Sequence, residues 1–238
     1  YSVDNSSHIW YKQVGQSSNR ILSLALSSDA SRISFCDQAG SLYYYSRNNL
    51  SVSEVWTSNS GACNRDYETD FGTTMSMTED GKYIVTIDNG DVSFFDSDSE
   101  VDEYGRIQPI WQFNTTSRSY SVDMSSDGLH ISVGMKDDVY YFKNHVPIAT
   151  INNVSSGVVV YGDTVTFNGS ATDSDGSVVN YEWSSSIDGV LSNQANFSAS
   201  SLSTGTHLIK FRAQDNHTFW SEYTTYQVIV NPNSDPTI

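Results

Sequence analysis

The sequence is poor in basic residues, and it lacks long apolar runs. It holds 12 Lys and Arg against 28 Asp and Glu, which gives a net charge of −16. Contacts with phosphate groups need clustered Lys and Arg, so this balance argues against nucleic acids and anionic membranes as partners. The longest apolar runs are a few residues, as in GVVVY at 157–161, too short for a membrane-spanning helix. No stretch shows a convincing helical pattern.

Cysteine is almost absent, since only Cys36 and Cys63 occur. Without a CxxC motif or a neighbouring His, neither metal binding nor a cysteine nucleophile is indicated. In a secreted chain a single pair predicts one disulfide. Closing a loop of about 27 residues would stabilise the fold by roughly 3 to 4 kcal/mol in the chain-entropy model. Two unrelated thiols, one of them buried, are the alternative.

Aromatic residues and turn formers are abundant. Aromatics make up 13% of the chain, and Ser, Thr, Asn and Gly separate short β-branched runs. This composition is typical of an all-β protein with many turns. A length of 238 residues favours two domains. The first residue is Tyr1 rather than Met, which indicates a processed protein or a piece of a longer one.

The chain also contains seven Asn-X-Ser/Thr sequons. Such a density fits a secreted glycoprotein, although an Asn- and Ser-rich chain produces several by chance. The glycosylation candidates are Asn5, Asn49, Asn114, Asn153, Asn168, Asn196 and Asn216.

One sequence pattern occurs three times in the first 145 residues. The copies read ILSLALSSDASRISFCDQAGSLYYYS from Ile21, TTMSMTEDGKYIVTIDNGDVSFFD from Thr73, and SYSVDMSSDGLHISVGMKDDVYYF from Ser119. Each copy predicts a strand, a turn, a second strand, a second turn and an aromatic third strand.

Each first turn has an aspartate at its corner, namely Asp29, Asp80 or Asp127. We expect these carboxylates to accept hydrogen bonds from backbone N–H groups of the turn rather than to act in catalysis. A fourth strand with a tryptophan follows the first two copies, with Trp56 in SEVWTS and Trp111 in QPIWQF. We expect these tryptophans to belong to the core. Four strands in 45 to 50 residues is the period of a β-propeller blade.

Residues 8–144 resemble WD-type and surface-layer-type β-propeller repeats, in the form S-X-D-G followed by I-X-V/F and an aromatic strand. The Gly-His and Trp-Asp dipeptides of the WD pattern are missing. Three units are fewer than the four to eight that close a ring, so upstream or partner-supplied units are expected. HIWYKQ, with Trp10, stands before the first copy and has no first three strands of its own. It either completes the third copy's sheet within the chain or inserts into a neighbouring molecule, head to tail.

The remaining chain predicts an immunoglobulin-like sandwich of about 85 residues, because short alternating strands recur with turn signals between them. Pro147 marks the entrance of this domain. The expected strands include VTF at 165–167, VVNYEW at 178–183, HLIKFRAQD at 207–215 and TYQVIV at 225–230.

Alternation in the second of these strands places Val179, Tyr181 and Trp183 on one face. The succession VTFNGSATDSDGSVVNYEW, LSTGTHLIKFRAQDN and WSEYTTYQVIV resembles the polycystic-kidney-disease (PKD) domain of archaeal and bacterial surface proteins, over residues 146–231. The resemblance implies that Trp183 is a buried core residue.

The resemblance also implies that Asp173, Asp175 and Asp215 lie in turns at one end of the sandwich, where some members bind calcium. The stretch ATDSDGSVVNYEW at 171–183 is therefore interpreted as the corner of the sandwich, with a cation site as the alternative. A catalytic pair of carboxylates is disfavoured because neither a His nor a nucleophile accompanies them.

A second acidic stretch, DSDSEVDEYG at 96–105, spaces Asp96, Asp98, Glu100 and Asp102 at alternate positions. Oxygen ligands at this spacing can surround calcium, but the central Gly and the final Glu of an EF-hand loop are missing. A solvated hairpin tip is the favoured interpretation. We expect no cofactor, with calcium as the alternative.

The sequence thus predicts propeller-like repeats over 1–145, a PKD-like domain over 146–232, and a linker or the start of a further domain over 233–238. We expect a non-enzymatic extracellular structural protein of the cell surface: a surface-layer, stalk or filament subunit that contacts itself or other surface proteins. The alternatives are an adhesin that binds glycans or proteins, and an accessory region of a secreted hydrolase.

Overall fold

The computed structural model describes residues 20–48, 51–58, 74–88, 90–115 and 118–233, with the backbone alone for the fourth strand. All regular elements in these ranges are strands, so the predicted all-β fold is confirmed. Within the described residues there is no helix of the length and hydrophobicity needed to cross a membrane. The chain divides into two compact units, Tyr1–Asn144 and His145–Ile238.

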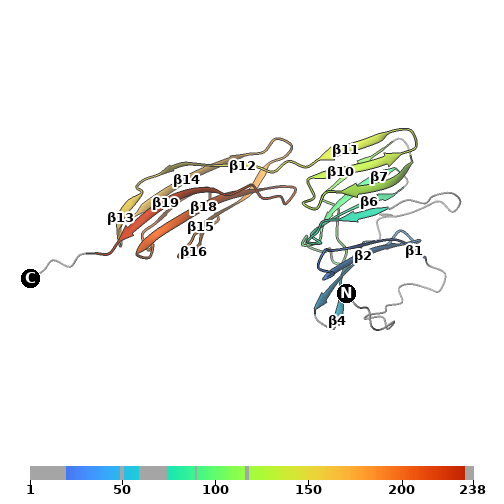
Figure 1. The fold of residues 1–238 in the computed structure, drawn as a ribbon, viewed down its shortest axis with the longest axis horizontal. Helices are drawn as coiled ribbons and strands as arrows, with labels where there is room; N and C mark the ends of the chain where they lie inside the picture. The colour runs from blue at the N-terminus through green and yellow to red at the C-terminus, as the bar shows by residue number, and fades with distance from the viewer. Residues whose placement is uncertain (1–19, 49–50, 59–73, 89, 116–117, 234–238) are drawn as a thin grey trace, which may run out of the picture. The chain divides into compact units, whose positions relative to one another are not determined.

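The first unit consists of three antiparallel sheets, each formed by consecutive strands in chain order. The first two sheets have four strands and the third has three (Figure 1). The first sheet contains β1 (Ile21–Leu26), β2 (Arg32–Asp37), β3 (Leu42–Asn48) and β4 (Ser51–Ser58). The second contains β5 (Met75–Met77), β6 (Tyr83–Asp88), β7 (Asp91–Asp96) and β8 (Trp111–Asn114). The third contains β9 (Ser119–Met124), β10 (His130–Met135) and β11 (Val139–Lys143).

The three sheets stack face to face, as propeller blades do, with their first strands side by side. β1 contacts β5, and β5 contacts β9. Aromatic rings fill the space between the second and third sheets, where Phe94 stacks on Trp111 at 5.3 Å and Trp111 meets Phe142 at 5.5 Å. The first and second sheets enclose a hydrophobic core of Cys36, Leu42, Tyr44, Met75, Ile84, Phe95 and Ile107.

The first turn of each copy is held by the predicted aspartate. In the second sheet, Asp80 Oδ1 accepts hydrogen bonds from Thr78 Oγ1 at 2.7 Å and from the Lys82 N–H at 2.9 Å. Asp29 and Asp127 accept the equivalent two bonds in the other sheets. Bonds from the Ser31 N–H and then from the Ser27 hydroxyl lower the pKa of Asp29 to about 2. The expected structural role of these corner aspartates is confirmed.

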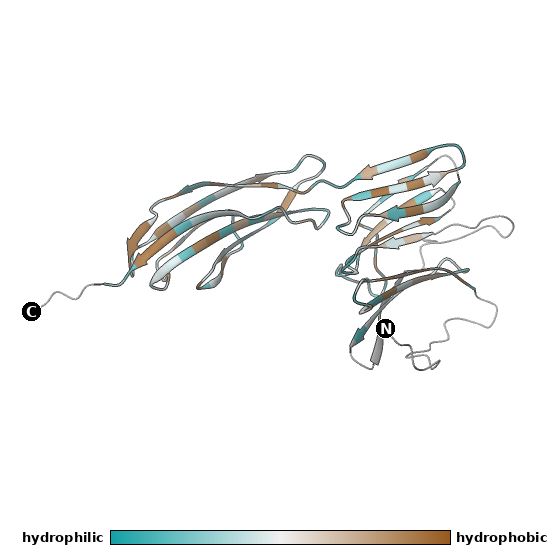
Figure 2. Cartoon of the chain, in the orientation of Figure 1, coloured by the Kyte–Doolittle hydropathy of each residue, from teal (hydrophilic) through white to brown (hydrophobic). Residues whose placement is uncertain are grey.

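The second unit is a β-sandwich. Hydrophobic and hydrophilic residues alternate along its strands (Figure 2), and the same alternation occurs along β10 of the first unit. One sheet has the order β12-β14-β17, and the other has the order β13-β19-β18-β15-β16. The strands are β12 (Ile148–Val154), β13 (Val158–Val160), β14 (Val165–Thr172), β15 (Val178–Ser185), β16 (Gly189–Ser192), β17 (Asn196–Ala199), β18 (Gly205–Asp215) and β19 (Thr224–Asn231).

Trp183 lies fully buried between the two sheets, as the family resemblance implied. Its ring stacks on Phe211 at 4.3 Å, and its Nε1 donates a hydrogen bond to the Ala195 carbonyl. The expectation that Val179 shares this face is wrong. The register of β15 with β18 shifts between Val178 and Asn180, and Val179 is 59% exposed. A bulge adds one residue to a strand, so the alternation is lost at that point.

Cys36 is fully buried and disulfide-bonded. Cys63, Trp10 and the side chain of Trp56 lie outside the described residues. The Cys36–Cys63 pairing and the placement of the strand around Trp10 therefore stay predictions.

Candidate functional site

The acidic turns at one end of the sandwich bring Asp173 and Asp215 together. Asp215 follows β18 and is 1% exposed, and its Oδ1 accepts hydrogen bonds from the backbone N–H groups of His217 and Phe219, both at 2.9 Å. Its other oxygen, Oδ2, is buried without a hydrogen-bond partner, and so is Asp173 Oδ2. Burial raises the pKa of Asp215, and the charge of Asp173 raises it further. A proton or a cation would stabilise this arrangement.

Asp175, the third predicted ligand, has a different role in the structure. Its Oδ2 accepts a hydrogen bond from the His145 N–H at 3.1 Å, which holds the first residue of the unit against the turn. Asn216 Oδ1 receives the Ser177 N–H at 2.6 Å and ties the same turn to the end of β18. In the described parts of the chain no three His, Cys, Asp or Glu side chains are grouped to hold a metal ion. A calcium site here stays a prediction, and main-chain or water oxygens would have to supply most of its ligands.

The acidic stretch after β7 forms two turns. Asp96 is buried, and its Oδ1 accepts a hydrogen bond from the Asp98 N–H. Its Oδ2 lies 3.7 Å from Lys82 Nζ. Asp102 Oδ1 accepts the N–H groups of Tyr104 and Arg106, both at 2.9 Å. Asp98 and Glu100 are exposed. The geometry is that of turn-forming carboxylates, the interpretation favoured from the sequence.

Ser185 and His207, both buried, meet the partly exposed Asp188 at the turn that joins β15 to β16. Ser185 Oγ lies 2.7 Å from His207 Nδ1, and Asp188 Oδ2 lies 3.6 Å from the same nitrogen. His207 Nε2 is 2.7 Å from the Ser203 carbonyl, so this nitrogen carries the proton. In a catalytic triad the Ser and the Asp bind opposite nitrogens of the ring. Here both lie at Nδ1. The three side chains therefore connect the turn between β15 and β16 to the residues at and before the start of β18.

Three of the four sequons of the second unit lie on one sheet. In the register of β12-β14-β17, Asn153 lies opposite Asn168, and Asn168 lies opposite Asn196. Directly opposite Cβ atoms are about 5 Å apart, too close for neighbouring glycans to be accommodated easily. Asn216 and Asn114 are exposed elsewhere, and Asn5 and Asn49 lie outside the described residues.

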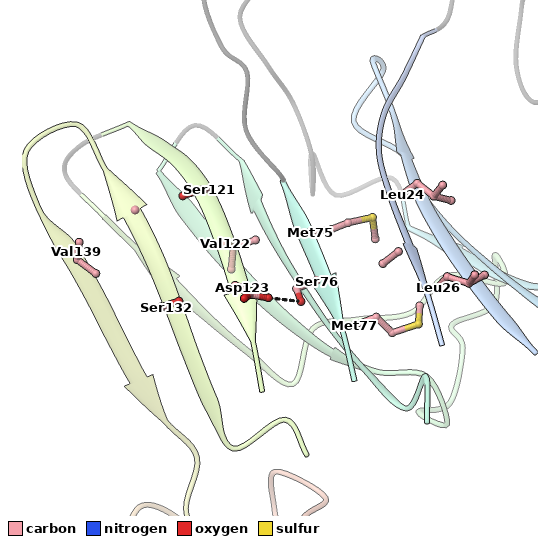
Figure 3. Close-up of a pocket in the computed structure, with 12 residues that line it drawn as sticks. Leu24, Leu26, Met75, Ser76, Met77, Ser121, Val122, Asp123, Ser132 and Val139 are labelled. Carbon is pink, nitrogen blue, oxygen red and sulfur yellow. Dashed lines mark hydrogen bonds between the residues drawn. The ribbon is translucent and has the colours of Figure 1, made fainter. Parts of the chain in front are cut away.

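The first strands of the three sheets line an open groove of about 650 Å³ (Figure 3). Leu24 and Leu26 project from β1, Met75 and Met77 from β5, and Ser76 Oγ donates a hydrogen bond to Asp123 on β9. The groove continues over β10 and β11 to Val139.

The face of the third sheet that points away from the second sheet is uncovered. Val139 is 76% exposed and Tyr141 is 64% exposed. Val139 corresponds to Leu42 in the first sheet and to Val92 in the second. Tyr141 corresponds to Tyr44 and Phe94. These four counterparts are at most 2% exposed. Each of those faces packs on the next sheet, and among the described residues no further sheet covers this face of the third one. Sequence reasoning did not single out Tyr141, although the alignment of the three copies places it with Tyr44 and Phe94.

Comparison with known proteins bears on the second unit. Residues 149–230 match the family model of the PKD domain. The crystal structure of the PKD1 domain of Vibrio anguillarum Epp has 22% identity and a TM-score of 0.30, and covers 37% of this chain and 99% of its own. The fibronectin(III)-like modules of Clostridium thermocellum CbhA have 17% identity and a TM-score of 0.32, and cover 37% of this chain and 100% of their own.

Hsv2 of Kluyvelomyces marxianus aligns with both units of this chain at 10% identity and a TM-score of 0.37. The alignment covers 87% of this chain and 65% of Hsv2, so the chain spans just under two thirds of that protein. No curated protein matches the sequence. PKD domains are typical modules of extracellular and cell-surface proteins.

Proposed function

We propose that this chain is a non-enzymatic structural module of the cell surface, of the surface-layer, stalk or filament type. In this proposal the three-sheet unit makes the protein–protein contacts and the PKD domain acts as a spacer. The observation that carries it is the uncovered face of the third sheet, where Val139 and Tyr141 are exposed although their counterparts are buried. Exposed apolar side chains grouped in this way mark interaction sites.

Two features support an extracellular location. The PKD domain is a module typical of that compartment. Cys36 is disulfide-bonded, and structural disulfides persist in oxidising environments.

The arrangement of Ser185, His207 and Asp188 supports a structural rather than a catalytic role, because the Ser and the Asp share one ring nitrogen.

Binding to the native surface tests the contact function. The full chain with a tag is added to cells of the source organism that lack their own copy. Tyr141→Asp places a charge on the uncovered face, whereas Tyr104→Asp changes an equally exposed tyrosine in the loop between β7 and β8. We expect wild type and Tyr104→Asp to bind and Tyr141→Asp to bind at least about tenfold more weakly, because aromatic anchors dominate interfaces. Absence of wild-type binding at micromolar concentration would contradict the proposal.

A glycan-binding adhesin is the second candidate, and the surroundings of Tyr141 favour it over the remaining alternatives. The exposed ring of Tyr141 stacks on His130 at 5.9 Å, and its hydroxyl lies 2.6 Å from His130 Nδ1. An exposed aromatic ring beside polar groups is a surface on which sugars can pack. A glycan array distinguishes the two functions, since selective binding of one glycan class, lost in Tyr141→Asp, would support the adhesin.

A further inference from the structure

The uncovered face of the third sheet differs chemically from the same face of the second sheet. Three residues of β6 on the face toward the third sheet are at most 6% exposed, namely Tyr83, Val85 and Ile87. In the registers of β6 with β7 and of β10 with β11, their counterparts on β10 are His130, Ser132 and Gly134. Two of these are polar, and the third has no side chain. The uncovered face therefore lacks the large apolar side chains with which one sheet packs on the next.

Gly134 keeps this face hollow. A Cβ at Gly134 would lie 2.6 Å from Ser121 Oγ on β9, so a larger residue would have to displace that serine. Gly134, Ser121 and Ser132 all line the open groove of about 650 Å³, with Val139 beside them. Sites for small ligands have volumes in this range. The part of the groove that lies over the third sheet thus has a floor of small polar side chains.

One row across the third sheet carries a carboxylate, a hydroxyl and an aromatic ring. Ser132 on β10 lies opposite Asp123 of β9 on one side and opposite Tyr141 of β11 on the other. Neighbouring strands are about 4.8 Å apart, so the row from Asp123 to Tyr141 spans roughly 10 Å. Asp123 and Ser132 both line the groove (Figure 3). Two linked sugar rings cover about the same length as this row.

The polar atoms of the groove floor have unused hydrogen-bonding capacity. Asp123 Oδ1 accepts hydrogen bonds from Ser76 Oγ at 3.2 Å and from the Met124 N–H at 2.9 Å. Within the described residues, Asp123 Oδ2 and the hydroxyls of Ser121 and Ser132 have no hydrogen-bond partner. A carboxylate oxygen accepts hydrogen bonds, and a serine hydroxyl both donates and accepts them. Adjacent hydroxyl groups of a sugar are complementary to this set.

The charges on the uncovered face are balanced. Asp123 carries a negative charge, and Lys143, which lies opposite His130, carries a positive one. A polyanion would need clustered Lys and Arg, and the net charge of −16 would repel it. Val139 and Tyr141 are the large apolar side chains that the described strands place on this face, whereas the core of a protein interface is mainly apolar. A neutral ligand rich in hydroxyl groups complements such a face.

We propose that this groove binds a neutral oligosaccharide of at least two sugar rings. One ring packs on the exposed ring of Tyr141, whose hydroxyl is held 2.6 Å from His130 Nδ1. The hydroxyl groups of the next ring form hydrogen bonds with Ser132 and Asp123. This inference rests on the adhesin, the second candidate function above, and assigns its ligand class and its binding residues.

Selective treatment of native cells tests the ligand class. Mild periodate followed by borohydride destroys the adjacent hydroxyl groups of sugars, whereas protease removes surface proteins. We expect periodate to abolish binding of the tagged full chain. Protease then identifies the source of the sugar, because binding that survives protease indicates a polysaccharide and binding that is lost indicates a glycoprotein. Binding that resists periodate would overturn the inference.

Calorimetry of the full chain tests the site, with purified neutral and acidic oligosaccharides released from the same cells. We expect a neutral one to bind with a dissociation constant of about 1 mM or lower. Ser132→Val introduces the residue of the second sheet and should weaken binding about fivefold. Asp123→Asn keeps Oδ1 as the acceptor for Ser76 and should weaken binding at least about tenfold, because a charged acceptor is lost.

Asp98→Asn, at an exposed aspartate in the loop after β7, is the matched control and should bind as wild type. Thermal unfolding should give all three variants the Tm of wild type within a few degrees. Equal binding by wild type, Ser132→Val and Asp123→Asn would overturn the site. Binding of the acidic oligosaccharides alone would overturn the ligand class. Either result would leave the adhesin function intact.

Failure of the candidate functions themselves gives different results. Wild type that binds neither untreated cells nor any released oligosaccharide would contradict the adhesin and this inference together. Binding to cells that protease abolishes and periodate does not would support the protein–protein contact function and would overturn this inference.

Discussion

At the scale of single residues, the corner turn of each copy needs a left-handed backbone conformation at the residue after the aspartate. Gly81 and Gly128 follow Asp80 and Asp127 with φ of 76° and 77°, and Ala30 occupies the same place with φ of 55°. A Cβ in this left-handed region costs roughly 1–2 kcal/mol. A Cβ at Gly81 would also lie 2.6 Å from Cβ of Arg32 in the first sheet. The glycine thus serves both the turn and the close approach of two sheets.

We therefore expect opposite effects from two exchanges at this position. Ala30→Gly should raise the free energy of unfolding by about 0.5 kcal/mol, since the relieved strain exceeds the added chain entropy of glycine. Gly81→Ala should lower it by about 2 kcal/mol, from strain and crowding together. Urea denaturation measures both, and a loss of stability in Ala30→Gly would contradict this account of the turn.

Asp215 should make the protein less stable as the pH rises. Its folded pKa is raised, so the native state holds the proton more tightly than the unfolded state does. The free energy of unfolding contributed by this group is therefore highest below the unfolded pKa, about 4, and falls as the pH rises through the raised folded value.

Asp215→Asn should remove this dependence, because Oδ1 remains to accept the His217 and Phe219 N–H groups while the charge is lost. We expect a gain of about 1 kcal/mol at pH 7 in calcium-free buffer. Asp137→Asn, an exposed position, is the control and should change little. If the predicted calcium site forms, calorimetry will show calcium binding to wild type and none to Asp215→Asn. An unchanged pH profile in Asp215→Asn would contradict the assignment.

At the scale of elements, the pairing of β15 with β18 is reinforced on its outer side by an aromatic-flanked ion pair. Arg212 and Glu182 are directly opposite, and Nε and Nη2 of the arginine each donate to a carboxylate oxygen at 3.0 Å. The guanidinium lies 4.2 Å from the ring of Trp220 and 4.8 Å from that of Tyr223. A planar guanidinium can make the paired bonds and both ring contacts together, which an ammonium group cannot.

Arg212→Lys should consequently cost about 1–2 kcal/mol despite the conserved charge, from the loss of one hydrogen bond and of ring stacking. Thermal unfolding measures the loss. A double-mutant cycle with Glu182→Gln should give a coupling of roughly 0.5–1 kcal/mol, the range of a partly exposed ion pair. A cost near zero for Arg212→Lys would mean that the paired hydrogen bonds and ring contacts of the arginine contribute little to the pairing of β15 with β18.

At the scale of the whole molecule, the two units have separate hydrophobic cores. One core is built from the first and second sheets, and the other lies around Trp183 in the PKD domain. No residue belongs to both clusters. A compact unit with its own core can fold alone.

We expect a fragment of residues 145–233 to unfold cooperatively with a Tm within a few degrees of the corresponding transition in the full chain. Calorimetry of the full chain should show two transitions, of which the fragment reproduces one. A fragment without a cooperative transition would show that the PKD domain depends on the rest of the chain.

Much of the fold was predictable because its determinants are local. Strand alternation, turn aspartates and the threefold repeat are read from neighbouring residues, and the PKD resemblance identified Trp183 as core. The bulge at Val179 was not predictable, since alternation in the sequence continues through it. A bulge is set by how two strands meet, and the strands of this pair are separated by a long stretch of chain.

The candidate sites, like the fold, were only partly predictable from the sequence. The turn aspartates were predictable from the sequence, because an aspartate at a turn corner accepts a hydrogen bond from the backbone N–H two residues further on. Only the tertiary structure decided that Asp215 is buried with an unpartnered oxygen while Asp175 holds His145. Only the tertiary structure decided that Tyr141 is exposed while Tyr44 and Phe94 are buried, although the three copies are alike. Burial depends on what packs against a residue from distant parts of the chain, and for the third sheet that neighbour is missing from the described chain.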